Sequence, residues 1–307
     1  MADADETVRA LEQGGIPPAA RARLDDLRAR GGSFFTSDLT ANELALTRRS
    51  GFRPLTQVMG SCFYNVGWQY MPMGFGGTAA GPFGFGAGSH AAGQTLELDT
   101  QTEAWNEARR LALARLAAEA TLAGADAVVG VRLKRGAFDW AAGLVEFTAF
   151  GTAFRSERYD LGEQPVLSNL TGQQFAALLE HGWWPAGLVA ASTVAYVMTG
   201  WQQQSRVSGF LSGLQNQELT DFTQGIYDTR SQTILRLNRQ AHELEAHGVV
   251  GIEIDQERHE HERDAGGAKY TDLIVAMHVI GTAVVEVSRR DDEPPVYIAL
   301  PLDEEHS

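Results

Sequence analysis

The feature that most constrains the fold of this chain is an internal duplication. Residues 37–66 align with residues 168–197 at a constant spacing of 131 residues, and nine of the thirty aligned positions are identical. About two identities would be expected by chance from ordinary composition. A second block, residues 125–131, is repeated at residues 246–252. The 307 residues are therefore expected to form two tandem copies of one domain.

The order of patterns along each copy predicts an α+β fold in which antiparallel strands pack on one long helix. A Ser or Thr cap opens a short helix in each copy, and an apolar run that begins near a proline follows it. A long helix with an apolar stripe comes next, and it is predicted at residues 102–122 and 221–247. Two strands complete each copy, at residues 127–135 and 144–155 in the first and at residues 249–257 and 272–287 in the second.

Four regions are expected along the chain. The two copies are preceded by an N-terminal arm with a charged helix and followed by an acidic tail. The first copy also carries an uncharged segment rich in glycine and phenylalanine, for which the second copy has no counterpart. The predicted boundaries are residues 1–33 for the helical arm, 34–156 for the first copy with its glycine-rich loop at 71–93, 165–289 for the second copy, and 290–307 for the tail.

Charge and cysteine content exclude several classes of protein. The formal net charge is −14, and binding to duplex nucleic acid needs a basic face, so no nucleic-acid partner is expected. A single cysteine, Cys62, excludes a disulfide scaffold and a zinc site of thiolates alone, and it is expected to be a buried small residue. The acidic N-terminus lacks a secretory pattern, and the uncharged stretches 54–96 and 182–205 are interrupted by glycine, proline and polar residues. We therefore expect a cytoplasmic protein without a membrane span.

The long helices and the strands that follow them resemble the YbjQ family of small bacterial proteins. The resemblance is carried by Ala108-Arg109, Gly124–Val131 and Gly151–Ala153 in the first copy and by Val249–Ile252 and Gly281–Val284 in the second. It implies α+β domains that assemble into rings, typically pentamers. The family is named for heavy-metal binding, although its biochemical function is not established. This chain departs from the family in being a tandem, in a rebuilt segment before the long helix, and in having Ala246-His247-Gly248 where the first copy has Ala-Asp-Ala.

The second copy contains a cluster of residue types that bind metals. If the strand at its start continues, Asp255, Glu257, His259 and His261 share one face, because alternate residues of a strand point to the same side. Imidazole and carboxylate groups at this spacing are ligands for a divalent metal such as Zn²⁺, with another chain completing the coordination. The alternative is a solvated, charged hairpin tip. Interleaved arginines and the lack of a counterpart in the first copy favour this alternative.

The charge of one strand is reversed between the two copies. When the copies are aligned on the glycine in each strand, Arg132 lies opposite Glu253 and Lys134 lies opposite Asp255. We hypothesise that these two faces meet, within one chain or between neighbouring chains, because opposite charges favour alternating contacts. Independent drift of two exposed surfaces would produce the same pattern.

The glycine-rich loop at residues 71–93 has two interpretations. It holds no Asp, Glu, Lys or Arg and matches no phosphate-binding motif, so nucleotide binding is not expected. Its aromatic residues Phe75, Phe83 and Phe85 could seal the pore of a ring or bind a partner protein or a lipid surface. The alternative is a flexible connection without a function of its own.

No catalytic motif stands out in the sequence. A nucleophile elbow, a His-Glu-x-x-His zinc motif, a nucleotide-binding loop and a thiol–imidazole pair are all missing. His278 is surrounded by apolar strand residues and is expected to be a sheet residue rather than a ligand. The sequence therefore predicts a non-enzymatic scaffold protein that assembles with itself into a ring, with a pentamer of tandem chains as the first expectation. Divalent-metal binding at His259 and His261 is the second interpretation, and association with a membrane surface through the uncharged segments is the third.

Overall fold

The computed structural model describes most of the chain and contains both expected copies. The residues described are 4–29, 35–67, 94–137, 143–159, 162, 164–200, 203, 218–265 and 268–287. The glycine-rich loop with Phe75, Phe83 and Phe85 lies outside the described residues, and so does the acidic tail at 290–307. Helices and antiparallel strands make up both copies, which confirms the predicted α+β class.

The first copy contains a short helix, a long helix and strands on either side of them. Thr40 caps the short helix, and Gly124, in the left-handed conformation with φ of 74°, ends the long helix. The long helix begins a few residues earlier than the apolar stripe predicts. The elements are α3 (Ala41–Arg49), β1 (Phe52–Asn65), β2 (Gln94–Glu97), α4 (Asp99–Ala123), β3 (Ala127–Ala137) and β4 (Leu144–Ser156).

The second copy repeats this order with a much longer hairpin. Its first hairpin strand continues to Ala265, well past the predicted end at residue 257, and the return strand begins at Ala268. The strand therefore continues through Asp255, Glu257, His259 and His261, which was the condition for these four residues to share one face. His259 and His261 lie within the strand rather than at a hairpin tip. The elements are β5 (Val166–Leu167), α5 (Gly172–Glu180), β6 (Trp183–Met198), α7 (Thr220–Glu243), β7 (Gly248–Ala265) and β8 (Ala268–Glu286).

Local backbone features repeat between the copies at equivalent positions. Both short helices begin with a capping box, formed by Thr40 with Glu43 in α3 and by Thr171 with Gln174 in α5. The strand after each long helix has a bulge at an equivalent glycine in the left-handed region, with φ of 70° in β3 and 62° in β7. The duplication in sequence is therefore a duplication of three-dimensional structure.

The two copies exchange their shortest strands. The sheets have the strand orders β1-β4-β3-β5 and β2-β6-β8-β7. Strand β5 of the second copy completes the first sheet, and β2 of the first copy completes the second sheet. The two tandem copies are therefore joined by shared sheets. Sequence patterns do not show this exchange, because strands of two and four residues are too short for an alternating pattern.

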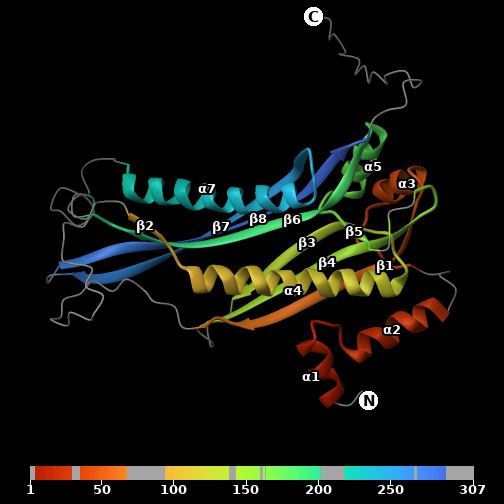
Figure 1. The fold of residues 1–307 in the computed structure, drawn as a ribbon, viewed down its shortest axis with the longest axis horizontal. Helices are drawn as coiled ribbons and strands as arrows, with labels where there is room; N and C mark the ends of the chain where they lie inside the picture. The colour runs from red at the N-terminus through yellow and green to blue at the C-terminus, as the bar shows by residue number, and fades with distance from the viewer. Residues whose placement is uncertain are drawn as a thin grey trace, which may run out of the picture.

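Helices and sheets alternate in layers (Figure 1). Helix α7 lies along one face of the second sheet, and α4 lies between the other face of that sheet and the first sheet. Trp105 of α4 packs with Phe147 of β4 and Tyr196 of β6, and Cys62 is buried in the same core, as expected. Strand β6 is covered on both faces, which explains why this strand carries no charged residue. No helix in the described part of the chain is long and apolar enough to cross a membrane.

The N-terminal arm forms two helices rather than the single charged helix expected from the sequence. They are α1 (Ala4–Glu12) and α2 (Pro18–Ala29). Ile16 and Leu24 of the arm are buried beside Ala123 of α4. The arm is therefore packed on the long helix of the first copy.

Candidate functional site

The candidate functional site is the contact between the two copies, which begins with a backbone ladder at the edge of β3. The segment before α5 runs parallel to β3, with Leu167 beside Val128. The amide of Ser168 donates to the main-chain oxygen of Val128 at 2.9 Å, and the amide of Val131 donates to the main-chain oxygen of Ser168 at 2.9 Å. Residues of the second copy therefore extend the sheet of the first.

The same segment is anchored to its own copy by two side chains. Ser168 Oγ lies 3.0 Å from Thr282 Oγ1 on β8, and Asn169 Nδ2 donates to the main-chain oxygen of Gly251 on β7 at 2.6 Å. Thr282 Oγ1 also donates to Asn169 Oδ1 at 2.7 Å. Ser168, Asn169 and Leu170 are all buried. Because buried polar groups without partners cost free energy, these bonds fix the segment between the two copies.

A buried arginine, Arg109 of α4, connects the first copy to β6 of the second. Its Nη1 atom donates to Ser192 Oγ at 2.5 Å, and its Nη2 atom donates to the main-chain oxygen of Ala190 at 2.8 Å. Nη2 also donates to Asn106 Oδ1 at 2.5 Å. Asn106 in turn bonds to both the amide and the carbonyl of Ser192. The guanidinium and the amide side chain thus bind one short stretch of β6 together.

The positive charge of Arg109 is held by neutral groups. None of its hydrogen-bond acceptors among the described residues is a carboxylate. Burial lowers the pKa of the guanidinium to about 10, so it remains charged at neutral pH. A charge removed from water is costly unless hydrogen bonds replace its hydration. The bond to Asn106 forms within α4, whereas the bonds to Ala190 and Ser192 offset that cost only while the two copies are in contact.

A half-buried histidine of β8, whose Nε2 atom is shielded from solvent, completes the contact. His278 Nδ1 lies 2.9 Å from Ser192 Oγ, and the imidazole stacks on Trp105 with 5.0 Å between the ring centres. No described residue offers a hydrogen bond to its Nε2 atom. Burial, together with the nearby charges of Arg135 and Arg109, lowers the pKa of the imidazole to about 3, so His278 is neutral at pH 7. His278 lies in the sheet as expected, and it also belongs to the contact between the copies.

The neutral state of His278 predicts a loss of stability in acid. The pKa of its imidazole is lower in the folded chain than the ordinary value of 6.5, so the unfolded chain binds the proton first. The free energy of unfolding should therefore fall as the pH drops from 6.5 towards 3, by at most about 1.4 kcal/mol per pH unit from this group. Urea unfolding at a series of pH values measures this slope. His278→Gln should reduce it, and His259→Gln, which removes an exposed imidazole, is the control. Equal slopes in both variants would contradict the assignment to His278.

Acidic and basic strands of the two copies meet in the structure through Arg135 and Glu257. Arg135 of β3 forms an ion pair with Glu257 of β7. Burial lowers the pKa of the Arg135 guanidinium, and the negative charge of Asp255 opposes this shift. The guanidinium also lies over the ring of Trp105, 4.8 Å from its centre. One end of the contact is therefore held by charge as well as by packing.

The four residues predicted to form an interface are not paired with one another among the described residues. Arg132 lies near the charged first turn of α3. Lys134 Nζ lies 5.7 Å from the ring centre of Phe150. Glu253 and Asp255 are exposed on β7, and Asp255 lies near the basic end of β3. A contact between these faces in neighbouring chains stays a prediction.

The candidate metal ligands lie along β7 without forming a cluster. His259 Nε2 lies 3.9 Å from Glu257 Oε2, and that carboxylate is already paired with Arg135. The ring of His261 packs edge-on against Tyr196, with 5.7 Å between the ring centres. Within the described ranges, no three His, Cys, Asp or Glu side chains are arranged to hold a metal ion. Because zinc in proteins usually takes four ligands, the described residues of one chain do not fit a resident metal.

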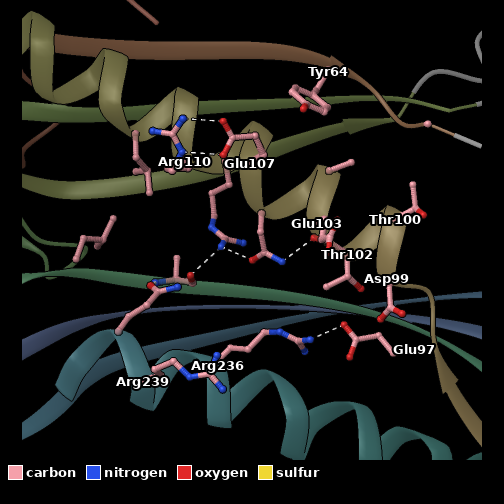
Figure 2. Close-up of a pocket in the computed structure, with 18 of the residues that line it drawn as sticks. Tyr64, Glu97, Asp99, Thr100, Thr102, Glu103, Glu107, Arg110, Arg236 and Arg239 are labelled. Carbon is pink, nitrogen blue, oxygen red and sulfur yellow. Dashed lines mark hydrogen bonds and ion pairs between the residues drawn. The ribbon is translucent and has the colours of Figure 1, made fainter. Parts of the chain in front are cut away.

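A cavity of about 1100 Å³ lies beside the contact, between α4 and α7 (Figure 2). Charged side chains of both signs line it, and two pairs are formed: Arg110 with Glu107 at 2.6 Å and Arg236 with Glu97 at 2.5 Å. The hydrogen bond from Arg110 lowers the pKa of Glu107, which keeps this carboxylate charged and unsuited to act as a general acid. No histidine or cysteine is among the described residues that line the cavity. The cavity is therefore an ion-paired cleft whose described lining holds no imidazole or thiol group.

Comparison with known proteins agrees with this organisation. A sequence model of the YbjQ family, described as "Putative heavy-metal-binding", matches residues 92–157 and residues 186–287. The chain belongs to this family. The first match spans β2, α4, β3 and β4, and the second runs from β6 to β8. Two matches to one family model confirm the tandem duplication.

A curated relative covers nearly the whole chain. The "Encapsulin nanocompartment protein Rv1762c" of Mycobacterium tuberculosis is 31% identical over 300 residues, which is 95% of this chain and 100% of the relative. The "UPF0145 protein" of Clostridium perfringens is 42% identical over 57 residues, which is 19% of this chain and 52% of the relative. No solved structure matches the chain.

The residues at the centre of the contact are not identified by sequence motifs. Arg109 belongs to the pattern that carries the family resemblance, and Ser192 lies in the repeated block at 168–197, where it is the equivalent of Ser61. The available signal is an arginine on the buried side of a long helix, between Trp105 and Ala112. An arginine in such a position needs acceptors from another element, but the sequence does not show which element supplies them.

Proposed function

We propose that this protein is a non-enzymatic, self-assembling structural protein that forms part of a protein nanocompartment. The proposal is supported by the relative of 31% identity, whose name places that protein in an encapsulin nanocompartment. The similarity extends over the full length of the relative, so it is not confined to one shared domain. The partner that we propose for this assembly is another copy of the same chain.

The observation that carries the proposal is the way the two copies bind each other. Each copy completes its sheet with a strand from the other, Arg109 is buried between them, and the half-buried His278 lies beside Ser192 in the same contact. A domain that is completed by a second domain in this way is suited to assembly, because the same contact can form between chains.

Native mass spectrometry tests self-assembly directly. The expected result is a defined multimer of the 33.3 kDa chain, and the family resemblance predicts a ring, with a pentamer of tandem chains first. Electron microscopy of the same sample would show whether the multimer is a closed ring. A spectrum that contains only the single chain at micromolar concentration would overturn the proposal.

Divalent-metal binding is the second candidate function, supported by the family description and by the contact of His259 with Glu257. The partner chain would have to supply further ligands, since one chain presents too few in its described residues. Native mass spectra of the same sample would also detect a bound metal ion. A mass increment of a metal ion that disappears in the double variant His259→Ala, His261→Ala would favour it.

Two further predictions concern the glycine-rich loop and the cellular location of the protein. Binding of a protein partner or a membrane surface through Phe75, Phe83 and Phe85 is a prediction about a loop outside the described residues. A cytoplasmic location likewise stays a prediction. Co-sedimentation with liposomes would support the membrane interpretation.

A further inference from the structure

We propose that the second copy of one chain binds the first copy of another chain head to tail, through the contact that already joins the copies within a chain. This inference rests on the proposed self-assembly and names the surfaces that carry it. Within a chain, the first copy supplies the edge of β3 and a face of α4, and the second copy supplies the segment before α5 and a face of β6. Because the copies are duplicates, every chain carries both halves of this contact a second time.

The first repeated half is the outer edge of β7. This strand pairs with β8 on one side, and no described segment pairs with its other side. Val131, beneath the segment before α5, is 2% exposed, whereas the equivalent Ile252 on β7 is 46% exposed. Natural proteins protect apolar, unpaired strand edges, since such edges bind further strands. The edge of β7 is thus equivalent to the edge of β3, but no described segment covers it.

The second repeated half is the segment immediately before α3. It is anchored to its own copy as the segment before α5 is: Ser37 Oγ lies 3.4 Å from Thr152 Oγ1, and Thr152 Oγ1 donates to Asp38 Oδ1 at 2.7 Å. Equivalent residues therefore hold both segments against their own copies. The two segments differ in how far their leucines are buried: Leu170 before α5 is 4% exposed, whereas the equivalent Leu39 before α3 is only half-buried. The burial that Leu39 lacks is the burial that a second chain would supply.

The helix contact is repeated by α7 and by the outer face of β1. Arg230 occupies in α7 the position of Arg109 in α4, and its side chain is exposed. On β1, Met59 is 45% exposed, whereas the equivalent Ala190, whose main-chain oxygen accepts from Arg109, is 4% exposed. In the docked pair, Arg230 of one chain reaches the main-chain oxygen of Met59 and the hydroxyl of Ser61 in the next chain.

Equivalent side chains of α7 and α4 already accept hydrogen bonds from the main-chain amides of Ala190 on β6 and Met59 on β1. The amide of Ala190 donates to Gln240 Oε1 of α7 at 3.0 Å, and the amide of Met59 donates to Glu119 Oε2 of α4 at 3.0 Å. Gln240 and Glu119 occupy the same position in their helices. Strands β1 and β6 are thus held in the same way by the long helix of their own copy. The other face of β6 is covered by α4, whereas Met59 on the other face of β1 is exposed.

The register and the closure of the contact follow from the pair within the chain. Leu167 beside Val128 becomes Thr36 of one chain beside Val249 of the next. A head-to-tail contact closes into a ring when its rotation permits, and it otherwise continues as a filament. Both assemblies use the same residues, so the contact can be tested without knowing the number of chains.

Replacing Ile252 with lysine tests the edge of β7. A charge at an exposed edge position is compatible with the folded chain but opposes the addition of a strand. Ile252→Lys is therefore expected to abolish the multimer and leave the single 33.3 kDa chain in native mass spectra. Leu235→Lys on α7 is the matched control, because Leu235 is 62% exposed and its equivalent in the covered helix α4, Ala114, is exposed as well. The control should remain multimeric.

The outcomes separate this inference from the proposed function. A multimeric wild type with an unchanged multimer in Ile252→Lys would overturn the head-to-tail contact and leave self-assembly standing. A single-chain wild type would overturn both. Loss of the multimer in Ile252→Lys but not in Leu235→Lys supports the contact.

Cross-linking tests the register independently of assembly strength. Neighbouring residues of paired strands have Cα atoms within the range of a disulfide, about 4.4–6.8 Å. Oxidised Thr36→Cys, Val249→Cys is expected to give covalent multimers on a non-reducing gel, and each single variant should give none. Val128→Cys, Leu167→Cys is the counterpart within one chain and should give only an internal disulfide. Formation of this internal disulfide, without covalent multimers from the first pair, would overturn the register.

Discussion

Replacing Arg109 with alanine is expected to lower the free energy of unfolding by roughly 3 kcal/mol. The guanidinium is the donor to the main-chain oxygen of Ala190, to Ser192 Oγ and to Asn106 Oδ1, in a buried layer between α4 and β6. Each hydrogen bond to a charged group contributes about 1.5–3 kcal/mol, and the desolvation of the charge offsets part of the sum. Urea unfolding of the variant and the wild type at neutral pH measures the difference.

The neighbouring residue provides a matched control for this prediction. Arg110 follows Arg109 on α4 but is exposed, and it pairs with Glu107 one turn earlier. Exposed helix ion pairs of this spacing contribute about 0.3–0.5 kcal/mol and are screened by salt, so Arg110→Ala should be nearly neutral. Arg109→Lys should lose most of the same stability, because a lysine cannot reproduce the planar fork of donors. Similar losses in Arg109→Ala and Arg110→Ala would show that Arg109 does not join the copies.

Gly60→Ala is expected to destabilise the first copy by about 3 kcal/mol or more. Gly60 lies where β1 crosses α4. A Cβ atom there would lie 2.5 Å from the amide nitrogen of Leu116 and still closer to the carbonyl oxygen of Ala112. Both are main-chain atoms of a helix, so no rotamer change relieves the clash, and strand and helix must separate. Thermal unfolding followed by circular dichroism would measure the effect.

Gly67→Ala is the control for this substitution. A Cβ atom at Gly67 would meet only the Thr100 methyl group, at 3.6 Å, which is an ordinary contact. The change in the free energy of unfolding should stay within about 0.5 kcal/mol. If both glycine variants lost the same stability, close packing of β1 on α4 would not be the cause. The equivalent of Gly60 in the second copy is Ala191, so the repeat itself gives no reason for a glycine at this position.

The elements of both copies could be predicted because their signals are local. Thr40 and Thr171 lie at the start of short helices, as caps do, and the apolar stripes place α4 and α7 within a few residues of their observed ends. The length of β7 could not be predicted in the same way. Its outer half is rich in charged residues and mostly exposed, and it is a strand because β8 pairs with it from Glu253 to Ala265. Strand pairing, rather than hydrophobic alternation, decides the structure there.

The candidate site could be predicted only in part. Opposite charges at Arg132, Lys134, Glu253 and Asp255 suggested the hypothesis that these faces meet, whereas the ion pair between the copies is formed by Arg135 and Glu257. The alignment of the repeats compares equivalent positions, whereas a contact depends on how the two sheets are placed against each other. The residue types of a metal site on β7 share a strand, but Glu257 is paired with Arg135 and His261 packs against Tyr196. Neither partner is close to the metal-ligand candidates in sequence.

The sequence by itself determined that the chain contains two copies of one α+β domain of the YbjQ family, each with a long helix followed by a hairpin. Identities at a constant spacing and the apolar periodicity of helices are properties that can be read along the chain. Only the tertiary structure decided that β2 and β5 exchange between the copies and that Arg109 is buried against Ser192. These two residues are 83 positions apart, and they meet because two folded surfaces dock on each other. Such docking depends on the complementarity of whole faces, which no short segment of sequence contains.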